Sequence, residues 1–120
     1  MDSDAYYVWR EGGFAVDILL DGDIDCEEME VGDSIVTMPN GDRYSALLMT
    51  REEVSRVMDS HALSGESLGG SYFCTPDLII IRFRGVTAMI NVMRDIIESG
   101  EISLILPKIS DGGTLDIPSM

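Results

Sequence analysis

The sequence is short of basic residues. Only 8 lysines and arginines oppose 22 aspartates and glutamates in 120 residues, and the formal net charge is −14. Such a charge repels the phosphates of nucleic acids and the surface of anionic membranes, so we expect neither as a partner. A basic protein is the natural complement of so acidic a chain, although acidity also serves solubility alone.

Cysteine, histidine and catalytic motifs are scarce as well. Cys26 and Cys74 lie far apart and form no CxxC pair, which indicates reduced thiols in a cytoplasmic protein rather than a disulfide framework. The one histidine, His61, falls on or near the apolar stripe of a predicted helix, where we expect a structural role. The motifs G-x-S-x-G, H-E-x-x-H, G-x-G-x-x-G and the P-loop do not occur. We therefore expect a protein that is not an enzyme and holds no cofactor. An enzyme that uses His61 with a thiol or a carboxylate is a third hypothesis, after the two given below.

We expect neither a secretory signal nor a membrane-spanning segment. A secretory signal begins with a basic segment followed by an apolar one, and the first ten residues contain neither. Apolar runs such as Leu78–Ile81 are far too short to cross a bilayer. The length fits one domain, which we expect over residues 1–109, followed by a flexible tail over residues 110–120 that contains Gly112, Gly113 and Pro118.

Alternating apolar residues and turn signals predict strands in the first half of the chain. Asn40-Gly41 is a strong hairpin signal, because both residues tolerate positive φ. Two interpretations stay open after Leu20: a hairpin turn at Asp21-Gly22, or a strand that continues through Cys26. The predicted strands of this half are residues 6–10, 14–20, 34–38 and 44–49.

The second half combines helices with further strands. Thr50 and Glu53 have the form of a capping box, which predicts a helix that ends before Ser64. Apolar residues recur at helical spacing from Val86 to Ile97, and Gly100 suits the position after that helix. Strands are predicted over residues 72–74, 78–84 and 102–106. The sequence therefore predicts an α+β fold: a mixed, mainly antiparallel sheet with two helices packed on one face.

An acidic run between Asp21 and Asp33 is the most unusual feature. It has no basic residue, and close like charges stay solvated unless something cationic covers them. It does not match an EF-hand loop, because Cys26 and Gly32 stand at the sixth and twelfth positions. A looser divalent-ion site is an alternative, but we expect no metal ligands here. A solvated loop face and a docking surface for a basic partner both fit the run, with Met29 and Val31 as apolar anchors in the second case. The expected contacts are Asp21, Asp23, Asp25, Glu27, Glu28 and Glu30.

About half of the chain resembles bacterial immunity proteins of contact-dependent inhibition and related toxin systems. The resemblance rests on Arg43–Val54, on Ser64-Gly65-Glu66, and on Tyr72-Phe73 before Asp77–Ile81. It implies a cytoplasmic inhibitor that binds a cognate toxin domain, and many such toxins are basic nucleases. It implies no catalytic residues. The location of the interface on the acidic run comes from charge, not from the resemblance.

Two main hypotheses follow. The first is a toxin-neutralising immunity protein that blocks the active site or the substrate channel of its partner. The second is a non-catalytic accessory or scaffold domain that homo-oligomerises, for instance as a homodimer built through an exposed strand edge.

Overall fold

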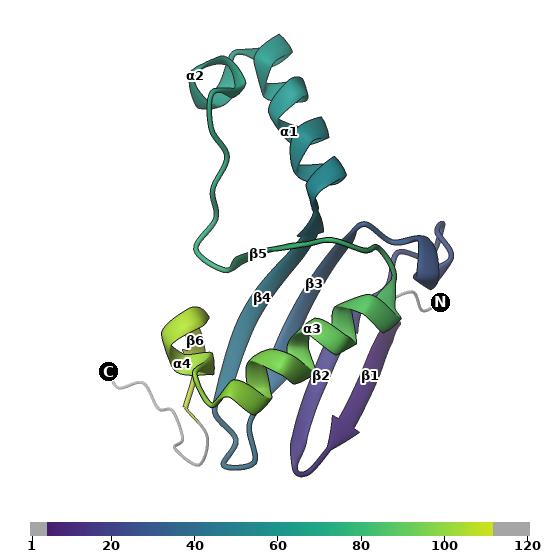
Figure 1. Cartoon of the computed structure of the whole chain (residues 1–120), viewed down its shortest axis with the longest axis vertical. Helices are drawn as coiled ribbons and strands as arrows, with labels where there is room; N and C mark the ends of the chain where they lie inside the picture. Colours follow the sequence, from purple (N-terminus) through teal and green to yellow (C-terminus); the bar gives the residue numbers. More distant parts are fainter. Residues whose placement is uncertain (1–4, 112–120) are drawn as a thin grey trace.

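Four antiparallel strands in chain order form the frame of the fold (Figure 1). The structure is a computed structural model and describes residues 5–111. On the far side of the fourth strand lie a parallel strand and a short antiparallel one, which complete a six-stranded sheet. The predicted α+β class with a mixed, mainly antiparallel sheet is thus confirmed. The strands are β1 (Tyr6–Glu11), β2 (Phe14–Leu19), β3 (Val31–Thr37), β4 (Arg43–Thr50), β5 (Leu78–Ile81) and β6 (Lys108–Ser110).

Tight turns connect two of the three strand pairs formed by the first four strands, β1–β2 and β3–β4. Gly12 and Gly13 have φ of 60° and 86°, and positive φ at both central residues is what a two-residue hairpin turn requires. Gly41 likewise has φ of 94° in the turn between β3 and β4, where the Asn40 side chain accepts a hydrogen bond from the Asp42 N–H at 2.9 Å. The Asn-Gly signal therefore marks a real hairpin.

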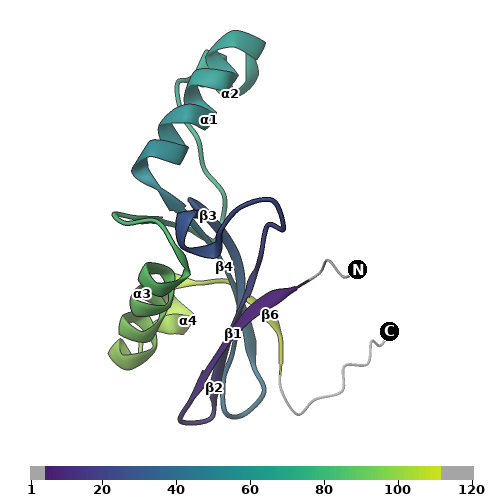
Figure 2. The same ribbon diagram turned by 90° about the vertical axis from the view of Figure 1, so that its right-hand side faces the viewer.

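Helix α3 (Val86–Ser99) covers one face of the sheet and closes the core (Figure 2). Its buried stripe is Val86, Met89, Ile90 and Met93, and it packs against inward residues of β2, β3 and β4. Gly100 ends the helix in the left-handed conformation, as predicted. The sheet residues in this core include Val16, Ile18, Val36, Ala46 and Leu48.

The position of helix α1 (Arg51–Ser64) differs from the prediction. We expected both long helices on one face of the sheet, but α1 extends beyond the end of the sheet and none of its residues is buried (Figure 1). The reason is local: Thr50 is both the last residue of β4 and the N-cap of α1, so no loop turns the helix back. The helix that joins α3 over the sheet is the short α4 (Ile102–Ile105). We call α1 and the following turn α2 (Glu66–Gly70) the arm.

Three further predictions need correction. The segment 72–74 is not a strand, and β5 ends at Ile81 rather than at residue 84. Residues 102–106 form the turn of α4 instead of a strand, because Ile102 and Leu106, four residues apart, are both buried while Leu104 is 83% exposed. The last strand is β6, which includes Ser110 of the predicted tail. Residues 112–120 of that tail lie outside the described residues. In residues 5–111 we find no helix with the length and apolarity that a bilayer crossing requires.

Candidate functional site

The acidic run forms the long connection between β2 and β3, which we call the acidic loop (residues 20–30). The Asp21 carbonyl accepts a hydrogen bond from the Ile24 N–H at 3.1 Å, and the Asp21 side chain accepts one from the Asp23 N–H at 3.0 Å. The Asp25 side chain then accepts from the Glu27 N–H at 2.9 Å and caps a 3-10 turn, η1 (Cys26–Glu28). The loop is therefore neither a tight hairpin nor a continuing strand, although the chain does turn at Asp21-Gly22.

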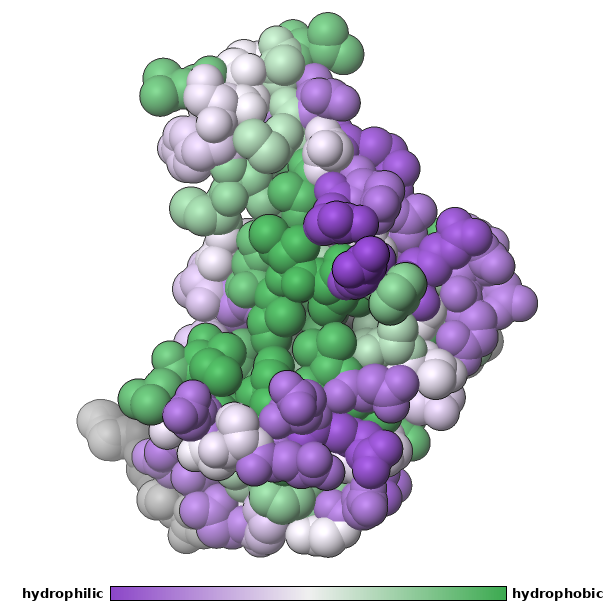
Figure 3. Space-filling model, in the orientation of Figure 1, coloured by the Kyte–Doolittle hydropathy of each residue, from purple (hydrophilic) through white to green (hydrophobic). Residues whose placement is uncertain are grey.

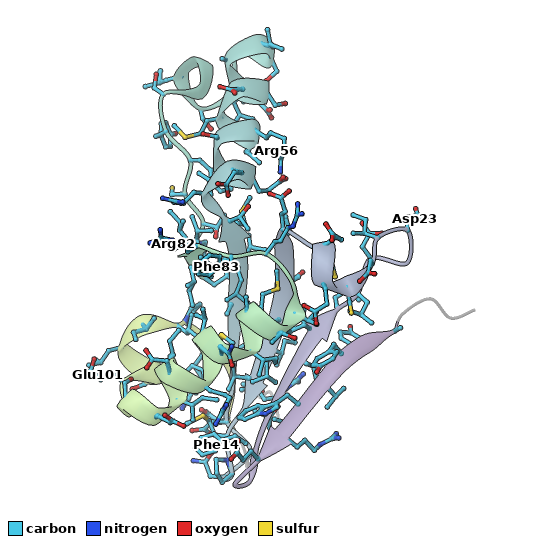
Figure 4. All side chains as sticks on the ribbon, turned by 45° about the vertical axis from the view of Figure 1, so that its right-hand side comes forward. Phe14, Asp23, Arg56, Arg82, Phe83 and Glu101 are labelled. Carbon is cyan, nitrogen blue, oxygen red and sulfur yellow. The ribbon has the colours of Figure 1, made fainter. Side chains whose placement is uncertain are left out.

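The structure divides the six predicted contact residues into two groups. Asp21, Asp23 and Asp25 are exposed, and no cation within residues 5–111 forms an ion pair with them. Figure 4 shows Asp23 at the tip of the loop. The second group, Glu27, Glu28 and Glu30, has partners inside the protein.

Glu27 and Glu28 hold the loop to the start of α3. Glu27 accepts hydrogen bonds from the Thr87 hydroxyl at 2.7 Å and from the Thr87 N–H at 3.3 Å, at a helix N-terminus that favours negative charge. Gly85 donates its N–H to the Met29 carbonyl at 2.8 Å. Glu28 forms an ion pair with Arg84 at 3.0 Å, and both side chains are 56% exposed. These two glutamates therefore have structural roles, whatever else they contact.

Glu30 connects the acidic loop to the arm. Its carboxylate accepts hydrogen bonds from the Thr50 hydroxyl at 2.8 Å and from Arg56 Nη2 at 2.7 Å. Arg56 also pairs with Glu53 at 2.8 Å. The Thr50 hydroxyl and, after it, Arg56 hold the pKa of Glu30 below its ordinary value, against an opposing effect of burial. Glu30 is thus an ionised anchor between the body and the arm.

A hollow of about 320 Å³ lies between the acidic loop and the arm. Ile24 and Val31 are 46% and 36% exposed, and both line it together with Asp21 and Arg56. Met29, which we expected as an apolar anchor, is only 3% exposed and packs into the core. Ile24 takes its place as the exposed apolar residue of the loop. The lining of the hollow therefore combines acidic residues with exposed apolar ones and one arginine. Figure 3 shows hydrophilic residues over the acidic loop on this face of the molecule.

The pairing of His61 with a carboxylate, one form of the third hypothesis, is present in the arm. His61 Nε2 is 3.5 Å from a Glu66 carboxylate oxygen, and the ring lies 6.2 Å from that of Phe73. Among the described residues, no hydrogen bond joins the His61 ring to a thiol or a hydroxyl, and no three potential metal ligands converge. Both cysteines are free, with Cys26 half-buried and Cys74 exposed.

Sequence reasoning missed the cations and the hydroxyls that the glutamates contact. Arg56, Arg84 and Thr87 are 26, 56 and 60 residues away from their glutamate partners, so no local pattern indicates the pairing. Comparison with known protein families, with curated proteins and with solved structures gave no match.

Proposed function

We propose that this protein is an inhibitor that binds a basic protein, with the acidic loop as its docking surface. The observation that carries the proposal is the exposure of Asp21, Asp23 and Asp25 on one loop, without a compensating cation in residues 5–111. Three like charges this close repel one another and gain from a cationic partner. A loop that only solubilised the protein would not need its shape to be fixed.

The acidic loop is fixed by its own hydrogen bonds. Asp21 and Asp25 each accept an N–H two residues ahead, and Glu27 fastens the loop to α3. A surface that is ordered before binding loses less conformational entropy when the partner arrives. The aspartates would speed association by long-range attraction, and the apolar Ile24 and Val31 beside them would add contact area.

The resemblance to immunity proteins gives this binding a biological role. An acidic inhibitor of a basic nuclease toxin would occupy the cationic surface on which nucleic acid phosphates otherwise bind. In this proposal the protein acts in the cytoplasm, binds one cognate toxin domain and performs no chemistry of its own. The partner is blocked rather than modified.

The proposal predicts that a large secreted protein with a toxin domain is encoded beside the gene for this chain, and this domain is the partner to test. We expect a complex with one toxin domain per inhibitor chain, loss of the toxin's activity at equal concentrations of the two proteins, and weaker binding at higher salt. A toxin domain that keeps full activity in excess inhibitor contradicts the proposal. So does a gene neighbourhood without any such domain.

A further inference from the structure

Strand β1 is an unprotected edge of the sheet. It pairs with β2 on one side and has no strand on the other within residues 5–111. Tyr6, Tyr7 and Val8 are 51%, 38% and 41% exposed. Edge strands usually avoid further pairing through proline, charged side chains, especially lysine, or a bulge. β1 has no proline, lysine or bulge, and its two charged residues, Arg10 and Glu11, lie at one end. The chain therefore presents six residues that can accept another strand.

The hydrogen bonds between β1 and β2 show which backbone groups are free. Leu20 donates its N–H to the Ala5 carbonyl at 3.0 Å, so residues 5, 7, 9 and 11 are those that bond to β2 in this antiparallel pair. The alternate residues Tyr6, Val8 and Arg10 direct their N–H and carbonyl groups outward. Val8 lies at the middle of these three.

We propose that β1 pairs antiparallel with β1 of a second copy of this chain, around a twofold axis at Val8. The outward residues then pair with one another: Val8 lies opposite Val8 of the second copy, and Tyr6 lies opposite its Arg10. Tyr7 lies opposite Trp9 in the intervening pairs. No like charges meet at any of these positions, so the strand complements itself.

The two faces of the paired strands are each complementary. Tyr6, Val8 and Arg10 share the face that no described helix covers, where an arginine beside a tyrosine ring gives a cation–π contact. Tyr7 and Trp9 share the α3 face, where aromatic residues opposite each other stabilise antiparallel strands. The Trp9 ring is already placed by Arg94 of α3, whose guanidinium lies 6.0 Å from the ring centre. Each copy thus offers a tyrosine to a preplaced tryptophan.

Charge determines how the dimer responds to salt. Two chains of −14 each repel one another, while β1 itself has one arginine and one glutamate. Salt screens the repulsion and leaves the strand pairing intact, so we expect association to strengthen with ionic strength. A complex with a basic partner responds in the opposite direction. An interface of one strand from each copy is small, so a dissociation constant in the micromolar range is expected.

The first test is sedimentation equilibrium of the full chain alone, over a range of concentrations at low and high salt. Val8→Lys places two ammonium groups opposite each other at the axis, and we expect association to weaken by roughly tenfold or more. Ile80→Lys is the matched control, since it changes an exposed residue of β5, the strand at the other edge of the sheet. Circular dichroism of both variants checks that they fold.

The second test uses oxidation in a background with Cys26→Ser and Cys74→Ser. Hydrogen-bonded residues opposite each other in antiparallel strands have Cα atoms about 5.5 Å apart, within the range of a disulfide. Val8→Cys should therefore give a disulfide-linked dimer, and Ile80→Cys should not. A wild-type chain that stays monomeric overturns the proposal. It is also overturned if dimerisation survives Val8→Lys, or if Ile80→Lys abolishes it instead. All these results are independent of toxin binding, which is measured with the partner present.

Discussion

The Glu30 carboxylate accepts a hydrogen bond from the Thr50 hydroxyl at 2.8 Å, while the Glu30 carbonyl accepts one from the Thr50 N–H at 3.0 Å. These two bonds join the end of the acidic loop to the residue where β4 becomes α1. None of the side chains of α1 is fully buried, so few apolar contacts hold this helix. Its attachment to the sheet depends strongly on polar contacts near Glu30.

We expect Glu30→Ala to lower the free energy of unfolding by about 1–2 kcal/mol, because the Thr50 hydroxyl loses its acceptor and Arg56 keeps only Glu53. Urea denaturation measures the change, and hydrogen exchange should show faster exchange of α1 amides. Glu52→Ala is the control, since Glu52 is exposed in the same helical turn and should change stability less. Equal effects of the two variants would argue against the anchor.

The anchor also predicts a dependence of stability on pH. Because the folded protein holds the pKa of Glu30 below the ordinary value of 4.5, ionised Glu30 stabilises the fold fully above that value. The contribution disappears as pH falls through the lowered pKa. The difference in unfolding free energy between the wild type and Glu30→Gln should therefore be constant near neutral pH and shrink in acid. A difference that stays constant into strong acid would contradict this assignment.

Gly85 packs against the acidic loop and tolerates no side chain. Its φ is 99°, and a Cβ there would lie 2.6 Å from a carboxylate oxygen of Glu27 and 2.7 Å from its carbonyl oxygen. We expect Gly85→Ala to destabilise the fold by about 2–4 kcal/mol. Gly100→Ala is the matched control, because Gly100 also has positive φ but nothing within 4 Å, and it should cost about 1 kcal/mol. Thermal unfolding that ranks the two variants equally would show that the loop yields at Gly85.

The local elements could be predicted because each depends on residues close in sequence. The hairpin turn between β3 and β4 follows from Asn40-Gly41, and helix α3 follows from its apolar stripe and from Gly100. The start of α1 follows from Thr50, whose hydroxyl accepts the Glu53 N–H at 3.1 Å. Caps and turns of this kind act within four residues, so the sequence alone contains them.

The wrong predictions, for residues 102–106 and for the position of α1, concern features that depend on how the elements pack together. Residues 102–106 are a short apolar run, and such a run fits a strand as well as a helical turn until the neighbouring elements are placed. Here Ile102 and Leu106 face the core while Leu104, midway between them, is 83% exposed, whereas a strand would place all three residues on one face. The direction of α1 could not be predicted either, because it does not depend on the residues within the helix. It follows from the direct connection of β4 to α1.

The sequence predicts which acidic residues belong to the candidate site, but not how the fold arranges them or what they contact. The sequence contains all six acids, yet only the fold shows that Glu27, Glu28 and Glu30 meet Thr87, Arg84 and Arg56. The exposed acids of the loop whose side chains form neither an ion pair nor a hydrogen bond outside the loop, within residues 5–111, are Asp21, Asp23 and Asp25. The proposed docking surface is therefore reduced from six acidic residues to three aspartates.

The association rate with the neighbouring toxin domain tests the central claim most directly. The variant combines Asp21→Lys, Asp23→Lys and Asp25→Lys, and the control makes the same change in charge at the exposed Asp95, Glu98 and Glu101. Stopped-flow measurements at low salt should give an association rate at least about tenfold lower for the loop variant, and a much smaller change for the control. The loop variant should also lose most of its dependence on salt. Equal rates for the two variants would contradict the proposal that the acidic loop is the docking surface.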